Sequence, residues 1–252
     1  MQSIEAWLNR PDIAELKKQN DSGELQKLFS KDFFRDPLRN IYRNPNVLYS
    51  FADGVVLYAH QRLDPAKNDI LEIKGKDFRL QDLLEDETYK VPSLVVGIFM
   101  TYLDVHVNRV PCDSYFVDER ATPFLYTHNI SMVFLENELL KELHYNPENT
   151  KYLFHNERKV LTFYSSLIQG RYYLVQIGDK EVEVISNWDQ GKYLKQGQRF
   201  GMVRWGSQVD LVIPLNQSVK YEVSVKPLDH VEAGLDPIIK ILGKGEQWRP
   251  TL

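Results

Sequence analysis

The pair Gly206-Ser207 places a hydroxyl directly after a glycine carbonyl, a combination that could do chemistry on its own chain. The pair lies within residues 199–214, where apolar and polar side chains alternate as they do in β-strands. A glycine inside such a pattern indicates a bulge or a close approach by another group. Two interpretations stay open from this pattern alone. The commoner one is a structural bulge between two core strands, and the other is a serine that attacks the preceding carbonyl.

A second group of polar residues follows an apolar run of strand length. Residues 93–100 form that run, and we expect both of its faces to be buried. Directly after it come Asp104, His106 and Arg109. Burial of such side chains is costly unless they are paired or lie at a site. The segment is therefore a candidate site, and histidine is the side chain best suited to accept and return a proton near neutral pH.

The elements that must position these residues are mostly strands. Strands are predicted at residues 55–59, 70–75, 93–100, 160–164, 172–178, 182–185, 207–214 and 220–225, and on either side of a turn within 231–239. A short helix is predicted at 80–84, while 115–143 is hard to assign and contains a strand or a helix at 132–143. We therefore predict an α+β, predominantly β protein.

The first part of the chain differs from the rest. Residues 3–30 have helical patterns, with Ser3 as a cap and Pro11 as the start of a second helix. The polar face of this arm is not markedly basic, so we expect the arm to pack against the body and not on a membrane. This pattern predicts an N-terminal helical arm at residues 1–32 and one mainly β domain at residues 33–252.

The composition is that of an ordinary soluble protein, with 43% hydrophobic and 26% charged residues. A formal net charge of −4 gives no reason to expect a nucleic-acid partner. Cys112 is the only cysteine, which excludes an intrachain disulfide and fits a reducing compartment. No apolar run approaches the about 20 residues that span a bilayer. We expect a cytoplasmic protein, with any membrane contact peripheral on the cytoplasmic face.

Several short motifs occur in an order that resembles the phosphatidylserine decarboxylase family. They are Phe33-Phe34-Arg35-Asp36-Pro37, Ala52-Asp53-Gly54, Ile73-Lys74-Gly75 with Leu83-Leu84, Leu103-Asp104-Val105-His106-Val107-Asn108-Arg109-Val110-Pro111, Asn156-Glu157-Arg158, Gln176-Ile177-Gly178 and Phe200-Gly201-Met202-Val203-Arg204-Trp205-Gly206-Ser207. The turn at 231–239 looks like the closing hairpin of that family. The resemblance covers about residues 33–240 and is strongest to the shorter subclass, whose histidine motif carries Asn-Arg.

The resemblance implies a β-sandwich or barrel core and a pyruvoyl-dependent decarboxylase made as a proenzyme. In such a protein Ser207 attacks the carbonyl of Gly206 and converts the amide to an ester. β-Elimination then separates a β chain, 1–206, from an α chain, 207–252, whose first residue becomes a covalent pyruvoyl group. The pyruvoyl carbonyl condenses with the substrate amine and accepts the electrons released as carbon dioxide leaves.

The resemblance also implies roles for single residues. Ser207 is the nucleophile and pyruvoyl precursor, His106 is the base and the candidate proton donor to the product carbanion, and Asp53 is the carboxylate that orients the imidazole of His106. Asp53 could instead belong to an ordinary Asp-Gly turn. Arg109 could bind the carboxylate or phosphate of the substrate bidentately, or form a structural ion pair.

Other chemistry-bearing residues are expected to be structural. Cys112 is predicted to be a buried, inert thiol. The five histidines other than His106 show no spacing typical of metal ligands, so no metal is predicted. Asn156-Glu157-Arg158 is predicted to form a structural network.

Three functions remain open at this point. The first is decarboxylation of phosphatidylserine to phosphatidylethanolamine at a membrane surface. The second is decarboxylation of a soluble amino acid or a related amine-bearing carboxylate, suggested by the weakly membrane-like arm and by the segment 115–143. The third is an uncleaved, non-enzymatic β-sandwich binding module. The expected partners are thus a phospholipid or amine-bearing substrate and, in a homo-oligomer, further copies of the chain.

Overall fold

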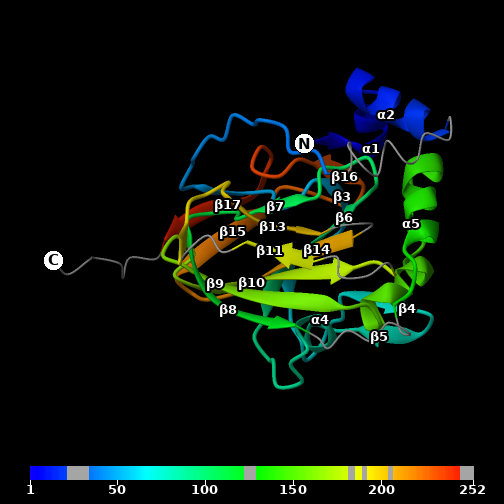
Figure 1. Ribbon diagram of the computed structural model, residues 1–252. Coiled ribbons are helices and arrows are strands. Elements are labelled where there is room, and N and C mark those ends of the chain that lie inside the picture. The colour runs from blue at the N-terminus through cyan, green and yellow to red at the C-terminus, as the bar shows by residue number, and fades with distance from the viewer. Residues whose placement is uncertain (22–33, 122–128, 181–184, 189–191, 204–206, 245–252) are drawn as a thin grey trace.

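The computed structural model describes residues 1–21, 34–121, 129–180, 185–188, 192–203 and 207–244 (Figure 1). The strands are β1 (Gln2–Ser3), β2 (Val47–Tyr49), β3 (Gly54–Leu63), β4 (Leu71–Ile73), β5 (Lys76–Phe78), β6 (Ser93–Met100), β7 (Val107–Arg109), β8 (Ser114–Ala121), β9 (Arg158–Ser165), β10 (Gly170–Gly178), β11 (Ile185–Asn187), β12 (Tyr193–Leu194), β13 (Arg199–Val203), β14 (Ser207–Pro214), β15 (Val219–Val223), β16 (Asp229–Val231) and β17 (Pro237–Lys244). The helices are α1 (Ile4–Leu8), α2 (Pro11–Asp21), α4 (Leu80–Leu84), α5 (Val133–Asn137), the π-helical turn η2 (Glu138–Glu142) and the 3-10 helix η3 (Pro147–Phe154). The predicted α+β, predominantly β class is confirmed.

A nine-stranded antiparallel sheet forms the centre of the molecule, in the order β1-β16-β3-β6-β14-β10-β9-β8-β12. Strand β6 lies between β3 and β14, and all eight of its residues are buried, as its continuous apolar sequence predicted. Strand β14 is bonded to β6 on one side and to β10 on the other. The strand that begins with Ser207 is therefore an interior strand of the main sheet.

Each face of this sheet buries its own apolar cluster. Side chains alternate across a strand, so Val209 and Leu211 of β14 point to one face and Val212 to the other. The Val209 face packs against two three-stranded sheets, β11-β13-β7 and β15-β17-β2, which makes that side a sandwich. The Val212 face contacts residues of the helices and of the β4-β5 hairpin.

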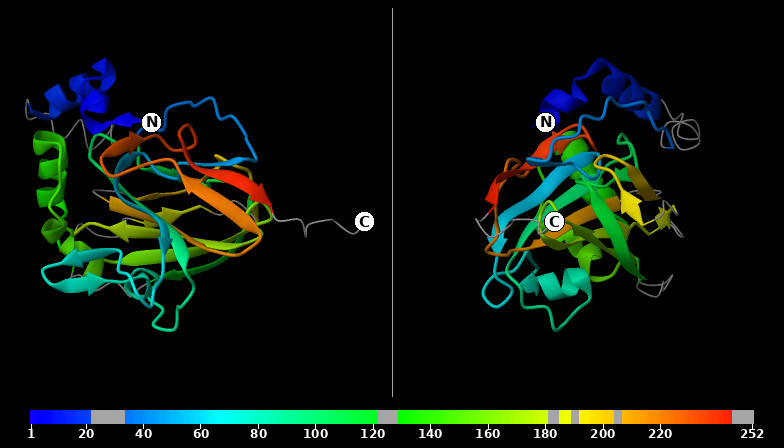
Figure 2. Two further views of the ribbon diagram at one scale, coloured as in Figure 1. Left: turned by 180° about the vertical axis from the view of Figure 1, so that it is seen from behind. Right: turned by 90° about the vertical axis from the view of Figure 1, so that its left-hand side faces the viewer.

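The N-terminal arm packs on the body, as expected. Gln2 and Ser3 pair with β16 as an edge strand, and Ser3 Oγ accepts a hydrogen bond from the Ala6 N–H at 3.2 Å, which caps α1. The side chain of Trp7 is buried in the second cluster. Figure 2 shows the arm lying against one edge of the central sheet, beside the return of the chain through β16. The arm was predicted to end at residue 32, which lies outside the described residues.

The segment 115–143, which the sequence left unassigned, divides into two parts. Its beginning is β8, a strand of the main sheet paired with β9, and its end is helical, as α5 followed by η2. In strand β8 only Ser114 is buried, and the other positions are half-buried or exposed and include charged residues, so the strand lacks a clear apolar pattern. The strand predicted at 182–185 falls mostly outside the described residues, and β11 begins at Ile185.

In the part of the chain that the structure describes, no helix is both long and apolar enough to cross a bilayer.

Candidate active site

Two sets of strand pairs bring Ser207 and His106 to the same end of the main sheet. Ser207 begins β14 and is paired with Met100, the last residue of β6, and with Gly178, the last residue of β10. The loop after Met100 leads to His106, whose carbonyl accepts a hydrogen bond from the Val203 N–H at 3.2 Å. Val203 ends β13, the strand that precedes Ser207 in the chain.

Ser207 is completely buried, and its Oγ makes no hydrogen bond to any described residue. A buried hydroxyl without a partner costs about 1–3 kcal/mol, so a fold does not keep one without a reason. A hydroxyl that no acceptor of the described residues engages is suited to act as a nucleophile. The other half of the predicted reacting bond, Gly206, lies outside the described residues.

His106 is also completely buried, and one hydrogen bond fixes its tautomer. Nδ1 lies 3.0 Å from the main-chain carbonyl oxygen of Asp104. A carbonyl can only accept, so Nδ1 carries the hydrogen and Nε2 is the nitrogen that can take up a proton. Burial lowers the pKa of His106 to about 4, opposed by Asp104 and reinforced by the charge of Arg35. The imidazole is therefore neutral near pH 7, the form that a base requires.

Asp53 has different partners from those predicted. Its carboxylate binds the guanidinium of Arg39 bidentately, at 2.6 and 2.5 Å, and accepts a third hydrogen bond from the Ala233 N–H at 2.7 Å. Burial raises the pKa of Asp53, while the hydrogen bonds and charge of Arg39 oppose that shift. The prediction gave Asp53 the task of orienting His106. In the structure Nδ1 of His106 lies against the main-chain carbonyl of Asp104, and a role for Asp53 in orienting the imidazole stays a prediction.

The side chain of Asp104 forms hydrogen bonds that stabilise the loop carrying His106. One carboxylate oxygen accepts hydrogen bonds from the N–H and the hydroxyl of Thr101, at 2.8 and 2.7 Å. The other oxygen lies 2.7 Å from Nε2 of His230. Burial alone would raise the pKa of Asp104, but His230 and Thr101 together hold it below its usual value. From the sequence, Asp104 was only part of the polar segment after residues 93–100, with no role of its own, and His230 was expected to be structural.

Arg109 forms a structural ion pair, which was the alternative to its predicted role in substrate binding. Its guanidinium donates to the Gly197 carbonyl at 2.9 Å and lies 3.3 Å from Asp36, which also binds Arg199 at 2.7 Å. The side chain borders a cavity of about 460 Å³ beside Trp188. Arg109 is paired with Arg199 at the start of β13. A role for Arg109 in binding substrate stays a prediction.

The surrounding motif residues hold strands together. Asn108 Oδ1 accepts a hydrogen bond from the Gln176 side chain at 2.8 Å, which ties β7 to β10. Asn156 donates to the carbonyls of Gly178 and Ile130, both at 2.8 Å, so its predicted structural role is confirmed. Cys112 is fully buried, as predicted, and burial raises its pKa to about 11, which favours an inert thiol.

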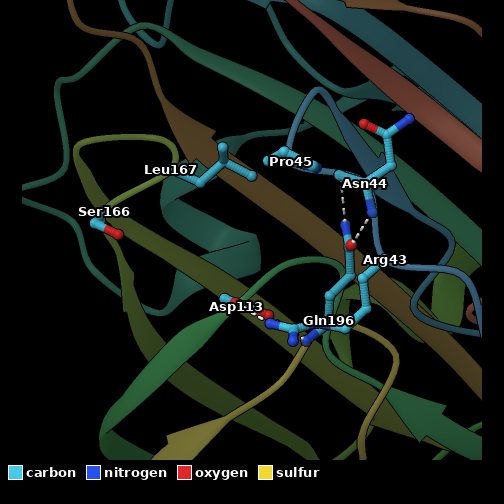
Figure 3. Close-up of a pocket in the computed structure, with 7 residues that line it drawn as sticks. All are labelled: Arg43, Asn44, Pro45, Asp113, Ser166, Leu167 and Gln196. Carbon is cyan, nitrogen blue, oxygen red and sulfur yellow. Dashed lines mark hydrogen bonds and ion pairs between the residues drawn. The ribbon is translucent and has the colours of Figure 1, made fainter.

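Another cavity, of about 370 Å³, is remote from Ser207. Its lining consists of Arg43, Asn44, Pro45, Asp113, Ser166, Leu167 and Gln196 (Figure 3). The Gln196 side chain accepts a hydrogen bond from the Asn44 N–H at 2.7 Å, and Arg43 forms an ion pair with Asp113. Leu167 lies in the turn before β10, whose nine residues span about 26 Å to Gly178. This cavity is therefore separate from the candidate site.

Among the described residues, no three His, Cys, Asp or Glu side chains gather in a way that could hold a metal ion.

The fold and the site define a class: a mainly antiparallel β protein with a buried serine at the head of an interior strand and a neutral, oriented histidine at the same end of the sheet. A family model described as phosphatidylserine decarboxylase matches residues 25–238. The chain belongs to the phosphatidylserine decarboxylase family, a family of carboxy-lyases.

Individual relatives agree with this assignment. The chain is 30% identical over 207 residues to the phosphatidylserine decarboxylase proenzyme of Chlorobium limicola, covering 82% of this chain and 76% of that protein. It is 30% identical over 190 residues to the proenzyme of the same name from Geotalea daltonii, covering 75% and 70%. A third relative, from Ehrlichia chaffeensis, is 28% identical over 188 residues, covering 74% and 66%. These comparisons do not favour the soluble-substrate enzyme or the uncleaved binding module.

Proposed function

We propose that this chain is a phosphatidylserine decarboxylase proenzyme that cuts itself between Gly206 and Ser207. The observation that carries the proposal is the buried Ser207 hydroxyl, which has no hydrogen-bond partner among the described residues. A neutral imidazole at the same end of the sheet supplies a base, and the family assignment supplies the reaction class.

In the proposed cleavage, Nε2 of His106 takes the proton of the Ser207 hydroxyl as Oγ bonds to the carbonyl carbon of Gly206. The C–N bond then breaks, the nitrogen of residue 207 receives the proton, and an ester replaces the amide. Loss of the Cα hydrogen of residue 207 expels the Gly206 carboxylate and leaves dehydroalanine. Water then replaces its nitrogen, which leaves as ammonia, and a pyruvoyl group remains. His106 serves as the proton carrier in these steps.

The surroundings of Ser207 fit a pyruvoyl group at this position. The residue is the first of β14, so the group would stand at the head of a strand whose partners, Met100 and Gly178, are fixed. When present, the group supplies an electron-accepting carbonyl for decarboxylation. His106 is placed to hold a proton and return it to the product, because its Nδ1–H is held by the Asp104 carbonyl.

We further propose that the substrate is phosphatidylserine and that the chain meets it at a membrane surface. Phosphatidylserine is in the printed names of the relatives above. The segment before β2 exposes Leu38 at 97% and Tyr42 at 73%, and Trp188 is partly exposed nearby at the cavity that Asp36 lines. Exposed apolar and aromatic side chains are typical of contact with a membrane interface. A cytoplasmic location and a homo-oligomer stay predictions, the former supported by the single buried thiol.

The cheapest test is the intact mass of the purified protein under denaturing conditions. We expect two chains, the smaller beginning at residue 207 with a pyruvoyl group, and a single full-length chain for Ser207→Ala. A full-length wild-type chain with a free serine, or a cleaved Ser207→Ala variant, contradicts the proposal.

The substrate requires a second experiment with the cleaved protein. We expect release of carbon dioxide from vesicles that contain phosphatidylserine and none from vesicles of phosphatidylcholine alone. The Ser207→Ala protein on the same vesicles is the matched control. Release from free serine but not from vesicles would leave the cleavage chemistry in place and overturn the substrate.

A further inference from the structure

We propose that His230 is a positioning residue for His106, and that Trp7 of the N-terminal arm holds His230 in place. The proposal rests on the proposed role of His106 as a base. It connects three segments that are far apart in the sequence: the start of the arm, the loop after β6 and strand β16. The links between them are contacts among buried residues, two through side chains and one through the main chain of Asp104.

The first link joins His230 to Asp104. The Asp104 carboxylate is an acceptor at both oxygens, so Nε2 of His230, 2.7 Å away, must be the donor. Both side chains are about 1% exposed. The second carboxylate oxygen is occupied by the two donors of Thr101. His230 therefore donates to the Asp104 carboxylate oxygen that Thr101 does not bind.

The second link joins Asp104 to His106 through the main chain. The carbonyl of Asp104 accepts the hydrogen bond from Nδ1–H of His106. A carboxylate held from both sides fixes the backbone of its own residue, and with it the direction of this carbonyl. If the Asp104 carboxylate loses its His230 partner, one buried oxygen is left without a hydrogen bond. A rearrangement of the loop that brings this oxygen to another donor then lowers the free energy. The imidazole can then carry its hydrogen on Nε2, the form that cannot take a proton from Ser207.

The third link joins His230 to the arm. The indole of Trp7 stacks on the imidazole of His230, with ring centroids 3.9 Å apart and planes at 13°. The arm is held there by its backbone, because Gln2 pairs with His230 and the Ile4 N–H donates to the Leu228 carbonyl at 3.1 Å. Trp7 therefore covers one face of the His230 imidazole and keeps the ring oriented toward Asp104.

Two substitutions of His230 separate positioning from simple packing. His230→Phe keeps an aromatic ring for Trp7 but has no donor, whereas His230→Gln keeps an N–H donor at a similar reach but loses the ring stack. If His230 positions His106, we expect the Phe variant to cleave itself slower by about 10- to 100-fold, the usual effect of removing a group that orients a site residue. The Gln variant, which keeps a donor but loses the ring stack, should cleave itself faster than the Phe variant and slower than wild type. The reverse order, or equal rates for both variants, overturns the proposal.

A spectroscopic measurement tests the same idea without relying on cleavage. With 15N-labelled histidine in the Ser207→Ala protein, the ring nitrogen shifts report which nitrogen carries the hydrogen. The signals of His106 are identified among the six histidines by their loss in His106→Asn. We expect the Nδ1–H tautomer in Ser207→Ala and in its His230→Gln derivative, and a mixture or the Nε2–H tautomer in the His230→Phe derivative. An unchanged tautomer in the Phe derivative overturns the proposal, whether or not the wild-type chain cleaves itself.

Trp7→Leu is a second variant, for use if His230→Phe does not fold. It leaves the donor in place but removes the ring that aims it, so the same change of tautomer is expected, with slower cleavage. Trp7→Phe, which retains a stacking ring, is the matched control. Native rates and a native tautomer in a folded Trp7→Leu protein contradict the role of the arm.

Discussion

His106 owes its chemical state to two separate features of its surroundings. Complete burial keeps the imidazole neutral, and the Asp104 carbonyl decides which nitrogen is basic. A base on the protein surface would be partly protonated at pH 6, whereas this one is not. This arrangement makes the free energy of unfolding depend on pH, because an exposed histidine in the unfolded chain takes up a proton at a higher pH.

The stability of the proenzyme should therefore depend on pH through His106. Unfolding raises its pKa from about 4 to its ordinary value of 6.5, so between these values the unfolded state binds the proton and stability falls as pH falls. For a move from pH 7 to pH 5 we expect a loss of about 2 kcal/mol from this residue. Urea unfolding of Ser207→Ala at both pH values measures it. The Ser207→Ala, His106→Asn double variant is the control, and an equal loss in both proteins contradicts the assignment.

At the scale of the elements, the approach of β3 to β6 depends on Gly54. Its φ is +149°, and a Cβ there would lie 2.1 Å from the carbonyl oxygen of Phe99. The Asp-Gly pair was open to interpretation as an ordinary turn. The structure shows that the glycine lets the backbone of β3 pass against β6, immediately after the carboxylate of Asp53.

Gly54→Ala should consequently separate the two strands and displace Asp53 from Arg39. We expect a loss of at least about 2 kcal/mol of unfolding free energy, since neither the conformation nor the space suits a Cβ. Gly243→Ala is the matched control, because no atom of the described residues lies within 4 Å of its Cβ position, and it should change stability by less than about 0.5 kcal/mol. Urea unfolding in the Ser207→Ala background compares the two, and similar values for both would contradict this role of Gly54.

At the scale of the whole molecule, the proposed cut falls beside an interior strand. Strand β14 is paired with β6 over eight positions and with β10 over six. Strands β16 and β17, which follow it in the chain, belong to the main sheet and to a packed three-stranded sheet. Residues 207–244 are therefore held by strands on several sides (Figure 1).

The two chains should stay together after cleavage. Separation would strip β14 from both neighbours and open both apolar clusters, a cost comparable to unfolding the domain. We expect one species in native mass spectrometry or size-exclusion chromatography, and two chains only after denaturation. Elution of the smaller chain alone under native conditions would contradict the structure.

Much of the architecture was present in the sequence. The continuous apolar run at 93–100 predicted a strand buried on both faces, and alternation at 207–214 predicted β14, because strand periodicity is a local property. The candidate serine and histidine could be recognised by residue type and motif order. Ser3 as a cap and Pro11 as a helix start were likewise local signals, and both are confirmed.

Only the tertiary structure decided which groups meet at the site. Every residue has a main-chain carbonyl, so nothing in the sequence marked that of Asp104 as the acceptor for His106. Arg39 reaches Asp53 from a segment without regular structure, and His230 reaches Asp104 because β16 pairs with β3. Such contacts depend on strand pairing between distant segments, which local periodicity does not encode. The sequence thus determined the strands and the reacting residue types, and the packing of those strands determined their partners.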